Sequence, residues 1–392
     1  MKLLPLAIFW GLLFLNYSAR TTLAPILPLI EDSLHLSHGQ AGGLFTSLAM
    51  GNSLSLLMAG RFASVWGYKR TVVASMVGIS VVLFSIQWVE RYAAFHVVFF
   101  LVGFSAGGYY PAIMPILTET YGSNHWGKVL GLHDSAASFS VFAVPLLVTL
   151  GLHFISWKSL LLVLGMAAFL IPVGFWKVAI EPKPALSLQR SRTLPLLKKR
   201  SVYVMAFIWM FMSASGFGLF SILPLYLIKE RGLGFDYANT LIGVCGASGV
   251  FVTILSGFLV DRYGYRKMLI LSLLATGLST VALALAPNLQ YLVVALVVQA
   301  TSSNVFFPAG LAAITRLNAL SDRAMAAGLI FFFGATFGCG VSPLILGYTA
   351  DHLSFRVGLL GLGVLTSASP LALRLLKEIT ANQKELPNLQ AR

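Results

Sequence analysis

The stretch Gly257-Phe-Leu-Val-Asp261-Arg262-Tyr-Gly264-Tyr-Arg266-Lys267 decides the fold of this chain. A related stretch, Gly60-Arg-Phe-Ala-Ser64-Val65-Trp-Gly67-Tyr-Lys-Arg70, occurs 197 residues earlier. Two further pairs share this offset, Tyr110-Pro111 with Phe307-Pro308 and Gly131-Leu132 with Gly328-Leu329. Chance does not readily produce three pairs at one offset. The sequence therefore predicts two parallel copies of one structural unit, an arrangement typical of membrane transporters.

The composition excludes an ordinary soluble enzyme. Of 392 residues, 57% are hydrophobic and only 10% are charged, whereas a soluble protein carries about a quarter charged residues. A bilayer span needs about 20 mostly apolar residues. We expect an all-α membrane protein with twelve transmembrane helices in two six-helix parallel repeats. The predicted helices span residues 4–30, 39–65, 70–88, 94–118, 127–151, 158–180, 202–228, 237–261, 267–286, 290–315, 324–350 and 356–376.

A long polar and basic interruption at 181–200 divides the chain into two halves. We expect an N-terminal six-helix bundle at 1–180, a basic cytoplasmic linker at 181–200, and a C-terminal six-helix bundle at 201–377. Residues 378–392 are predicted to form a cytoplasmic tail.

The net charge of +14 lies in short basic clusters between apolar stretches, so no nucleic acid partner is expected. Most of these clusters fall on one side of the helix map, and cytoplasmic loops carry an excess of Lys and Arg. Both termini are therefore predicted to be cytoplasmic, in a multi-pass protein of the plasma or inner membrane. Cys245 and Cys339 lie in apolar runs and indicate no metal site. No cofactor motif is visible.

The stretch from Gly257 to Lys267 resembles the signature loop of the major facilitator superfamily of secondary transporters. The resemblance extends over nearly the whole chain and implies a functional monomer. It also implies that the loop is a cytoplasmic latch whose acid pairs with basic groups or a helix end in one conformation. The first copy departs from the pattern at Ser64 and Val65. An alternative is that both loops only set the topology. The predicted latch residues are Gly60, Gly67, Arg70, Gly257, Asp261, Arg262, Gly264 and Arg266.

Arg20 is the most informative single residue, because it lies deep in an apolar segment. A guanidinium there is costly unless it faces a water-filled cavity or a partner. Its planar fork suits a carboxylate or phosphate, so an anionic cargo is the expected ligand. Two alternatives are an ion pair that joins two helices and snorkelling to the membrane surface. Position 217, which repeats Arg20 in the second half, is Phe217, and a single cation favours a monoanion.

The string Asn16-Tyr17-Ser-Ala19-Arg20 resembles the first-helix pattern of the anion:cation symporter branch, which carries organic anions such as sugar acids. Asn16 and Tyr17 share a helix face with Arg20 and are predicted to bind the cargo with it. Tyr109 and Asn304 are the further predicted substrate contacts. Ala19 and Ala106 occupy positions where that branch has acids.

His133 and Asp134 are the remaining candidates for proton coupling. Asp134 is the one carboxylate predicted well within a span, and His133 can titrate near neutrality. The alternative is that both residues are capped or hydrated from the nearby cytoplasmic end of the helix.

The sequence as a whole predicts a secondary active transporter of a small organic anion by alternating access, with possible proton coupling. The partners would be the anion, a proton or other coupling ion, and the lipid bilayer. One rival is a proton-driven efflux pump for amphipathic compounds, in which Arg20 serves the fold and Asp134 is essential. Another is a membrane sensor that does not transport. An enzyme is not expected, because no nucleophile or metal constellation is visible.

Overall fold

The computed structural model describes residues 3–122, 125–182, 196, 198–318 and 322–376. These residues form helices and short connections, with no strand among them. Ten helical segments in the described ranges are long and apolar enough to cross a membrane. Two more helices of 29 residues each, α3 (His38–Trp66) and α12 (Phe235–Tyr263), pack among them. The all-helical prediction is confirmed.

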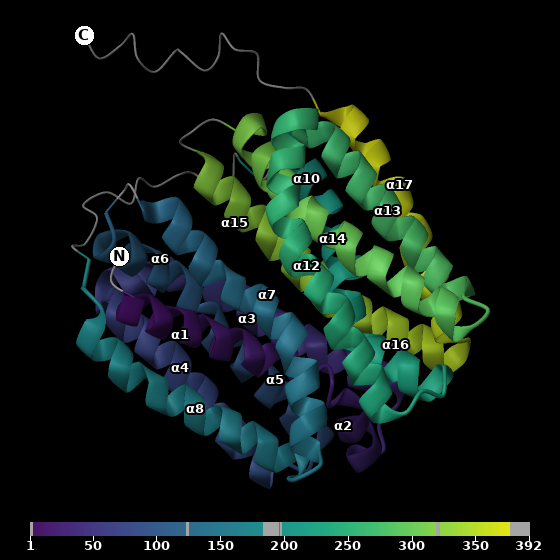
Figure 1. Ribbon diagram of the computed structural model, residues 1–392, viewed down its shortest axis with the longest axis horizontal. Coiled ribbons are helices and arrows are strands. Elements are labelled where there is room, and N and C mark those ends of the chain that lie inside the picture. Colours follow the sequence, from purple (N-terminus) through teal and green to yellow (C-terminus); the bar gives the residue numbers. More distant parts are fainter. Residues whose placement is uncertain (1–2, 123–124, 183–195, 197, 319–321, 377–392) are drawn as a thin grey trace.

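The first half of the chain forms one bundle, drawn in purple to teal (Figure 1). Besides α3, its helices are α1 (Leu3–Thr21), α2 (Leu27–Leu34), α4 (Tyr68–Ser85) with η1 (Ile86–Trp88), α5 (Tyr92–Gly107), α6 (Tyr109–Thr120), α7 (Trp126–Leu152) and α8 (Trp157–Val178).

The second half forms a matching bundle, drawn in green to yellow (Figure 1). Besides α12, its helices are α10 (Arg200–Ser213), η3 (Ala214–Gly218), α11 (Leu219–Leu225), η4 (Tyr226–Glu230), α13 (Tyr265–Leu285), α14 (Leu289–Leu317), α15 (Arg323–Phe333), η6 (Gly334–Val341), α16 (Ser342–His352), α17 (Phe355–Ala368) and η7 (Ser369–Leu375). The predicted tail lies outside the described residues, and so does most of the predicted linker.

The two bundles repeat one packing scheme. Helix α12 begins and ends 197 residues after α3, and α13 begins 197 residues after α4. Helix α3 packs on α5 as α12 packs on α14, and α4 packs on α8 as α13 packs on α17. The prediction of parallel repeats is therefore confirmed in three dimensions.

Two predicted helices are interrupted where a backbone donor is missing. The span predicted at 4–30 ends as a regular helix at Thr21 and resumes at Leu27. Pro25 lies in this gap, and proline has no N–H to donate. The span predicted at 94–118 breaks at Gly108, three residues before Pro111. In the second bundle, η3, η4 and η6 are π-helical segments within longer helices.

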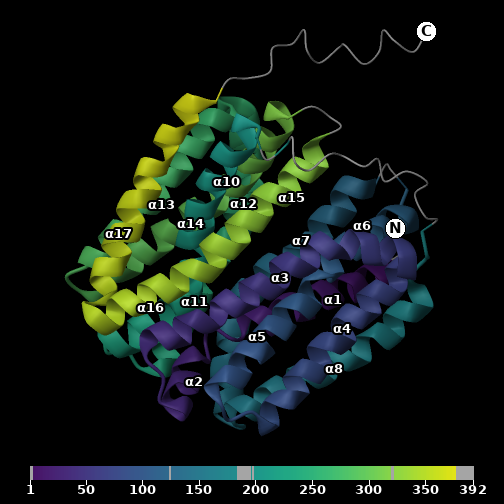
Figure 2. The same ribbon diagram turned by 180° about the vertical axis from the view of Figure 1, so that it is seen from behind.

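The two bundles meet mainly where α3 packs against η6 and α16, and where α7 packs against α12. Figure 2 shows α3 beside α16. We call the end with Gly67 and Gly264 the signature end, and the end with His38 and Asp351 the opposite end. Helices α3 and α16 approach closely at the opposite end, because a Cβ at Gly42 would lie 2.2 Å from the Pro343 carbonyl oxygen. Only glycine permits this approach.

Candidate functional site

Arg20 lies near the end of α1 and is partly buried. One terminal nitrogen, Nη1, donates to Asn52 Oδ1 at 3.3 Å, and Nη2 donates to Asn16 Oδ1 at 3.3 Å. The guanidinium carbon lies 4.3 Å from the centre of the Tyr17 ring, a cation–π contact. The buried Nε has no hydrogen-bond partner among the described residues. All of these contacts are with uncharged groups.

No carboxylate of the described residues forms an ion pair with Arg20. A guanidinium held only by amide oxygens and a ring keeps its full positive charge and part of its donor capacity. The site can therefore bind an anion with a charge-assisted hydrogen bond.

Asn16 joins Arg20 to the rest of the first bundle. Its amide oxygen accepts from Arg20, and its amide nitrogen donates to the Ala106 carbonyl on α5 at 3.2 Å. The side chain is buried, so its orientation is fixed by both bonds. The amide thereby orients the guanidinium.

His133 and Asp134 lie on α7 and contact two tyrosines of α6, Tyr109 and Tyr110. His133 Nδ1 lies 2.9 Å from Asp134 Oδ1, and His133 Nε2 lies 3.1 Å from the Tyr109 hydroxyl. The Tyr110 hydroxyl donates to Asp134 Oδ2 at 3.1 Å. His133 is fully buried, whereas the Asp134 side chain is 46% exposed. This arrangement links a buried imidazole to a partly exposed carboxylate.

The other predicted substrate contacts, Tyr109 and Asn304, form no hydrogen bond with Arg20. Tyr109 is buried, and its hydroxyl bonds to Phe9 and His133. Asn304, on α14 in the second bundle, donates to the Ala300 carbonyl at 2.7 Å. Phe217 is exposed on η3.

The two signature loops share their backbone geometry. Gly67 and Gly264 have φ values of 105° and 84°, a region that other residues rarely adopt. In the first loop, Glu181 Oε1 accepts from the backbone nitrogen of Tyr68 at 2.6 Å, and Oε2 accepts from that of Lys69 at 3.1 Å. This carboxylate caps the positive end of α4.

The predicted latch residues are largely exposed in this conformation. Asp261 is exposed and forms no ion pair among the described residues. Arg262 lies over the Tyr263 ring, and Arg266 donates to the Leu373 carbonyl at 3.0 Å. A Cβ added at Gly60 or Gly257 would meet no described atom within 4 Å, and Arg70 is exposed.

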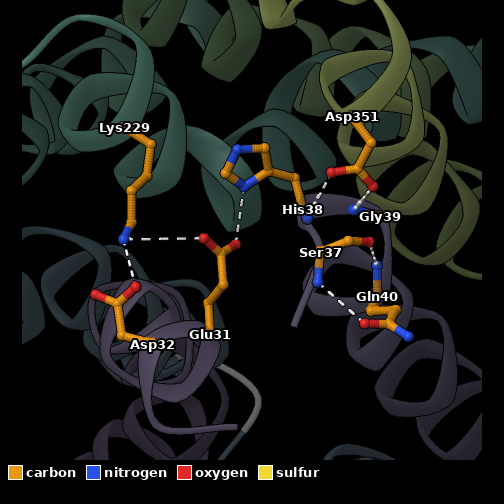
Figure 3. Close-up of polar contacts among 8 residues, drawn as sticks. All are labelled: Glu31, Asp32, Ser37, His38, Gly39, Gln40, Lys229 and Asp351. Atoms are coloured by element: carbon orange, nitrogen blue, oxygen red, sulfur yellow. Dashed lines mark hydrogen bonds and ion pairs between the residues drawn. The ribbon is translucent and has the colours of Figure 1, made fainter. Parts of the chain in front are cut away.

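A charged cluster holds the two bundles together at the opposite end (Figure 3). Asp351 accepts from the backbone nitrogens of His38 and Gly39, each at 2.8 Å. His38 Nδ1 lies 2.9 Å from Glu31 Oε2, and Lys229 contacts both Glu31 and Asp32. Helix α16 and η4 of the second bundle are thereby bound to α2 and α3 of the first.

This cluster was not predicted from the sequence, and neither was the contact of Asn52 with Arg20. The contact between His38 and Asp351 joins residues that lie 313 positions apart in the chain, so no local pattern marks the cluster. The described residues contain no group of three or more His, Cys, Asp and Glu side chains that could hold a metal ion. A pocket of about 380 Å³ at the opposite end, lined in part by His153, Trp157 and Asp236, lies apart from Arg20.

The comparisons with known proteins agree with this architecture. The chain is 24% identical over 266 residues to a hexuronate transporter of Bacillus subtilis, a match that covers 64% of this chain and 63% of that protein. It is 26% identical over 223 residues to an MFS-type efflux pump of Mycolicibacterium smegmatis, with 53% and 52% covered.

Among solved structures, a bacterial homologue of the human lysosomal transporter Spinster, inward-facing and unoccupied, superposes with a TM-score of 0.81. The match covers 95% of this chain and 96% of that one at 15% identity, which supports the fold alone. The model of the Major Facilitator Superfamily matches residues 9–262 and 250–391. The chain therefore belongs to the Major Facilitator Superfamily and is an integral membrane transporter rather than an enzyme.

Proposed function

We propose that this transporter carries a small organic anion with a single carboxylate or similar group, and that Arg20 binds the anion. The observation that carries the proposal is the guanidinium without a protein counter-ion among the described residues. Its contacts are two amide oxygens and the Tyr17 ring. An arriving carboxylate would neutralise the charge and give the unsatisfied Nε a partner.

The similarity to a hexuronate transporter supports this cargo class, because a hexuronate is a sugar with one carboxylate. Phe217 stands where a second cation would repeat Arg20, which also favours a monoanion. Asn16, Tyr17 and Asn52 would orient the guanidinium, and Asn304 would contact the cargo from the second bundle. Tyr109 belongs with the His133 and Asp134 pair.

The His133 and Asp134 pair is the proposed proton-coupling site. Its carboxylate is partly exposed while its imidazole is buried, so the carboxylate would exchange a proton with water while the ring stays covered. Asp134 would then supply an acid in the first bundle, where Ala19 and Ala106 leave the symporter-like pattern without one.

Alternating access would proceed by rocking of the two bundles. In this conformation the charged cluster joins them at the opposite end, and the exposed Asp261 would form its latch contact in the other conformation. The excess of basic residues at the signature end favours a cytoplasmic location for that end and for both termini. The transporter would act as a monomer.

The test is a thermal-shift assay of the purified protein. A panel of D-glucuronate, D-gluconate, lactate and glycerol 3-phosphate is compared with uncharged D-glucose, since a ligand of the folded state raises the melting temperature. We expect at least one monoanion to stabilise the wild type. Arg20→Ala should abolish the shift, and Arg20→Lys should weaken binding about 10- to 100-fold because it lacks the planar fork.

Arg91→Ala is the matched control, because Arg91 is exposed at the start of α5 and far along the chain from the site. It removes the same charge and should leave binding unchanged. Equal anion binding by the wild type and both Arg20 variants would remove Arg20 from the site. The similarity to an efflux pump gives the rival outcome, in which amphipathic compounds bind and only Asp134 variants lose them.

A further inference from the structure

The Tyr109 hydroxyl makes two contacts that together fix its proton. It donates to the Phe9 carbonyl at 3.2 Å and lies 3.1 Å from His133 Nε2. A carbonyl can only accept, and a tyrosine hydroxyl has one proton. With that proton directed at Phe9, the hydroxyl can only accept from His133. Both contacts are hydrogen bonds only if Nε2 carries a proton.

The other side of the imidazole faces Asp134. The distance of 2.9 Å from His133 Nδ1 to Asp134 Oδ1 requires a proton between these atoms, because two lone pairs would repel. Oδ2 already accepts from Tyr110. His133 is fully buried, so no bulk water can relieve an unmatched pair. The network therefore holds two protons on His133 and Asp134 together.

We propose that this conformation holds the His133 and Asp134 pair in its proton-loaded form, and that Tyr109 is the positioning residue that makes Nδ1 the proton-exchanging nitrogen. This inference rests on the proton-coupling part of the proposed function. The proton passes between Nδ1 and Asp134, whose carboxylate is 46% exposed, and from there to water. Nothing else is transferred, and the ring keeps its Nε2 proton for as long as the Tyr109 hydroxyl donates to the Phe9 carbonyl.

Loss of the proton breaks one contact of the network. Either Nε2 keeps its proton and Nδ1 separates from Oδ1, or the remaining proton lies between Nδ1 and Oδ1 and the Tyr109 hydroxyl turns from the Phe9 carbonyl to donate to Nε2. The second change removes a bond between α6 and α1, the helix that carries Arg20 about three turns after Phe9. By this second change, proton occupancy would be linked to the helix that carries the proposed anion site.

The groups that face the imidazole define the expected pH dependence. Asp134 lies on its own helix, Tyr109 and Tyr110 come from α6, and α1 contributes the Phe9 carbonyl. Asp134 has no Lys or Arg partner among the described residues. The Tyr109 and His133 rings are nearly parallel, with an interplanar angle of 8°.

The experiment is NMR of the full-length protein with 15N-labelled histidine, in which His133→Gln identifies the His133 signals. In the wild type we expect Nε2 to be protonated in the loaded form, with one proton lost from the pair as the pH rises. A His133 that stays neutral with its proton on Nδ1 from about pH 5 to 8 would overturn the proposal, because Tyr109 would then donate to Nε2.

The variant Tyr109→Phe tests the positioning role. It leaves a buried, charged N–H without an acceptor, which costs more than an unpaired lone pair, so the midpoint of proton loss should fall by about one pH unit. Tyr226→Phe is the matched control, because the buried Tyr226 hydroxyl also donates to a carbonyl, that of Leu283, at 3.2 Å. In Tyr226→Phe, the midpoint of proton loss from the His133 and Asp134 pair should equal that of the wild type.

An unchanged midpoint in Tyr109→Phe would overturn the positioning role. If this variant does not fold, the protonation of Nε2 in the wild type still decides the proposal. The measurement needs no cargo, so it is independent of the anion panel. Titration of His133 without anion binding would leave the proton site in place and reject the cargo, and the reverse result would reject the proton site alone.

Discussion

The carboxylate of Asp351 accepts hydrogen bonds from the backbone N–H groups of His38 and Gly39, both at 2.8 Å, across the boundary between the two bundles. His38 is the first residue of α3, so the carboxylate also faces the positive end of that helix. A side chain of α16 thereby satisfies donors at the start of α3 that have no partner within the helix. The opposite end is closed by this contact between charge and backbone.

Asp351→Asn should weaken this closure, because an amide has one oxygen and no charge. A charge-assisted hydrogen bond is worth about 1.5–3 kcal/mol, so the closed fraction should fall measurably. The measurement is double electron-electron resonance, which gives the distance between spin labels attached at Phe154 and Leu353. These two side chains are 80% and 70% exposed. The labels require a background without Cys245 and Cys339.

Asp236→Asn is the control for Asp351→Asn. Asp236 also faces the other bundle, but its contact with His153 is 3.4 Å long and both side chains are more than half exposed. Such pairs contribute little, so the label distance should not change. Identical distances in the Asp351 variant and the wild type would contradict the role assigned to Asp351.

The closed end should also depend on pH through His38. The hydrogen bond that protonated His38 donates to Glu31 raises the pKa of His38 above 6.5. The charges of Glu31 and Asp351 add to this effect, and burial and Lys229 oppose it. A raised pKa means that protonated His38 stabilises this conformation. The stabilisation is complete below pH 6.5 and is lost as the pH rises through the raised pKa.

The same spin labels, measured from about pH 5.5 to 8.5, check this expectation. His38→Gln should remove the dependence, and Glu31→Gln should move the midpoint back toward the ordinary value of histidine. A closed fraction that stays constant over the range in the wild type would show that His38 does not contribute.

Asn52→Asp should inactivate the proposed anion site. The new carboxylate would lie where an amide oxygen now accepts from Arg20 at 3.3 Å, and it would neutralise the guanidinium. Anion affinity should fall at least about tenfold. Asn52→Ala removes the amide without adding charge and should change affinity far less. Thermal shifts with the anion panel measure both, and undiminished binding to Asn52→Asp would exclude direct recognition by Arg20.

Gly42→Ala should hinder closure by sterics alone. The added Cβ would lie 2.2 Å from the Pro343 carbonyl oxygen, and a backbone atom cannot move aside as a side chain can. Overpacking of this kind costs about 1–3 kcal/mol. In Gly361→Ala, at a position with no neighbour within 4 Å, the spin-label distance should match that of the wild type. A normal closed fraction in Gly42→Ala would show that α3 and α16 can separate slightly without opening.

The repeat and the helical architecture could be predicted because both depend on local properties of the chain. Apolar runs indicate membrane-spanning helices, and the spacing of Gly67 and Gly264 indicates the repeat. The break after Thr21 was missed, because hydropathy does not register the donor that Pro25 lacks. A proline in a span can also be accommodated by neighbouring helices, so its effect is decided by packing.

The candidate site could be predicted in part for the same reason. Asn16 and Tyr17 lie on the same helix as Arg20, at spacings that place them beside it. Asn52 comes from α3, and its approach depends on how two helices are rotated against each other. The interbundle cluster of Asp351, His38 and Glu31 depends on the packing of three separate helices, for which the sequence has no local signal.

The contact of α3 with α16 at the opposite end includes glycine, backbone carbonyl and carboxylate groups. Parting such surfaces uncovers less hydrocarbon than parting two leucine-lined faces would. Exposure of apolar area is what gives a structural transition a large heat-capacity change. Parting this contact should therefore contribute little to the heat-capacity change of the conversion between the two access states.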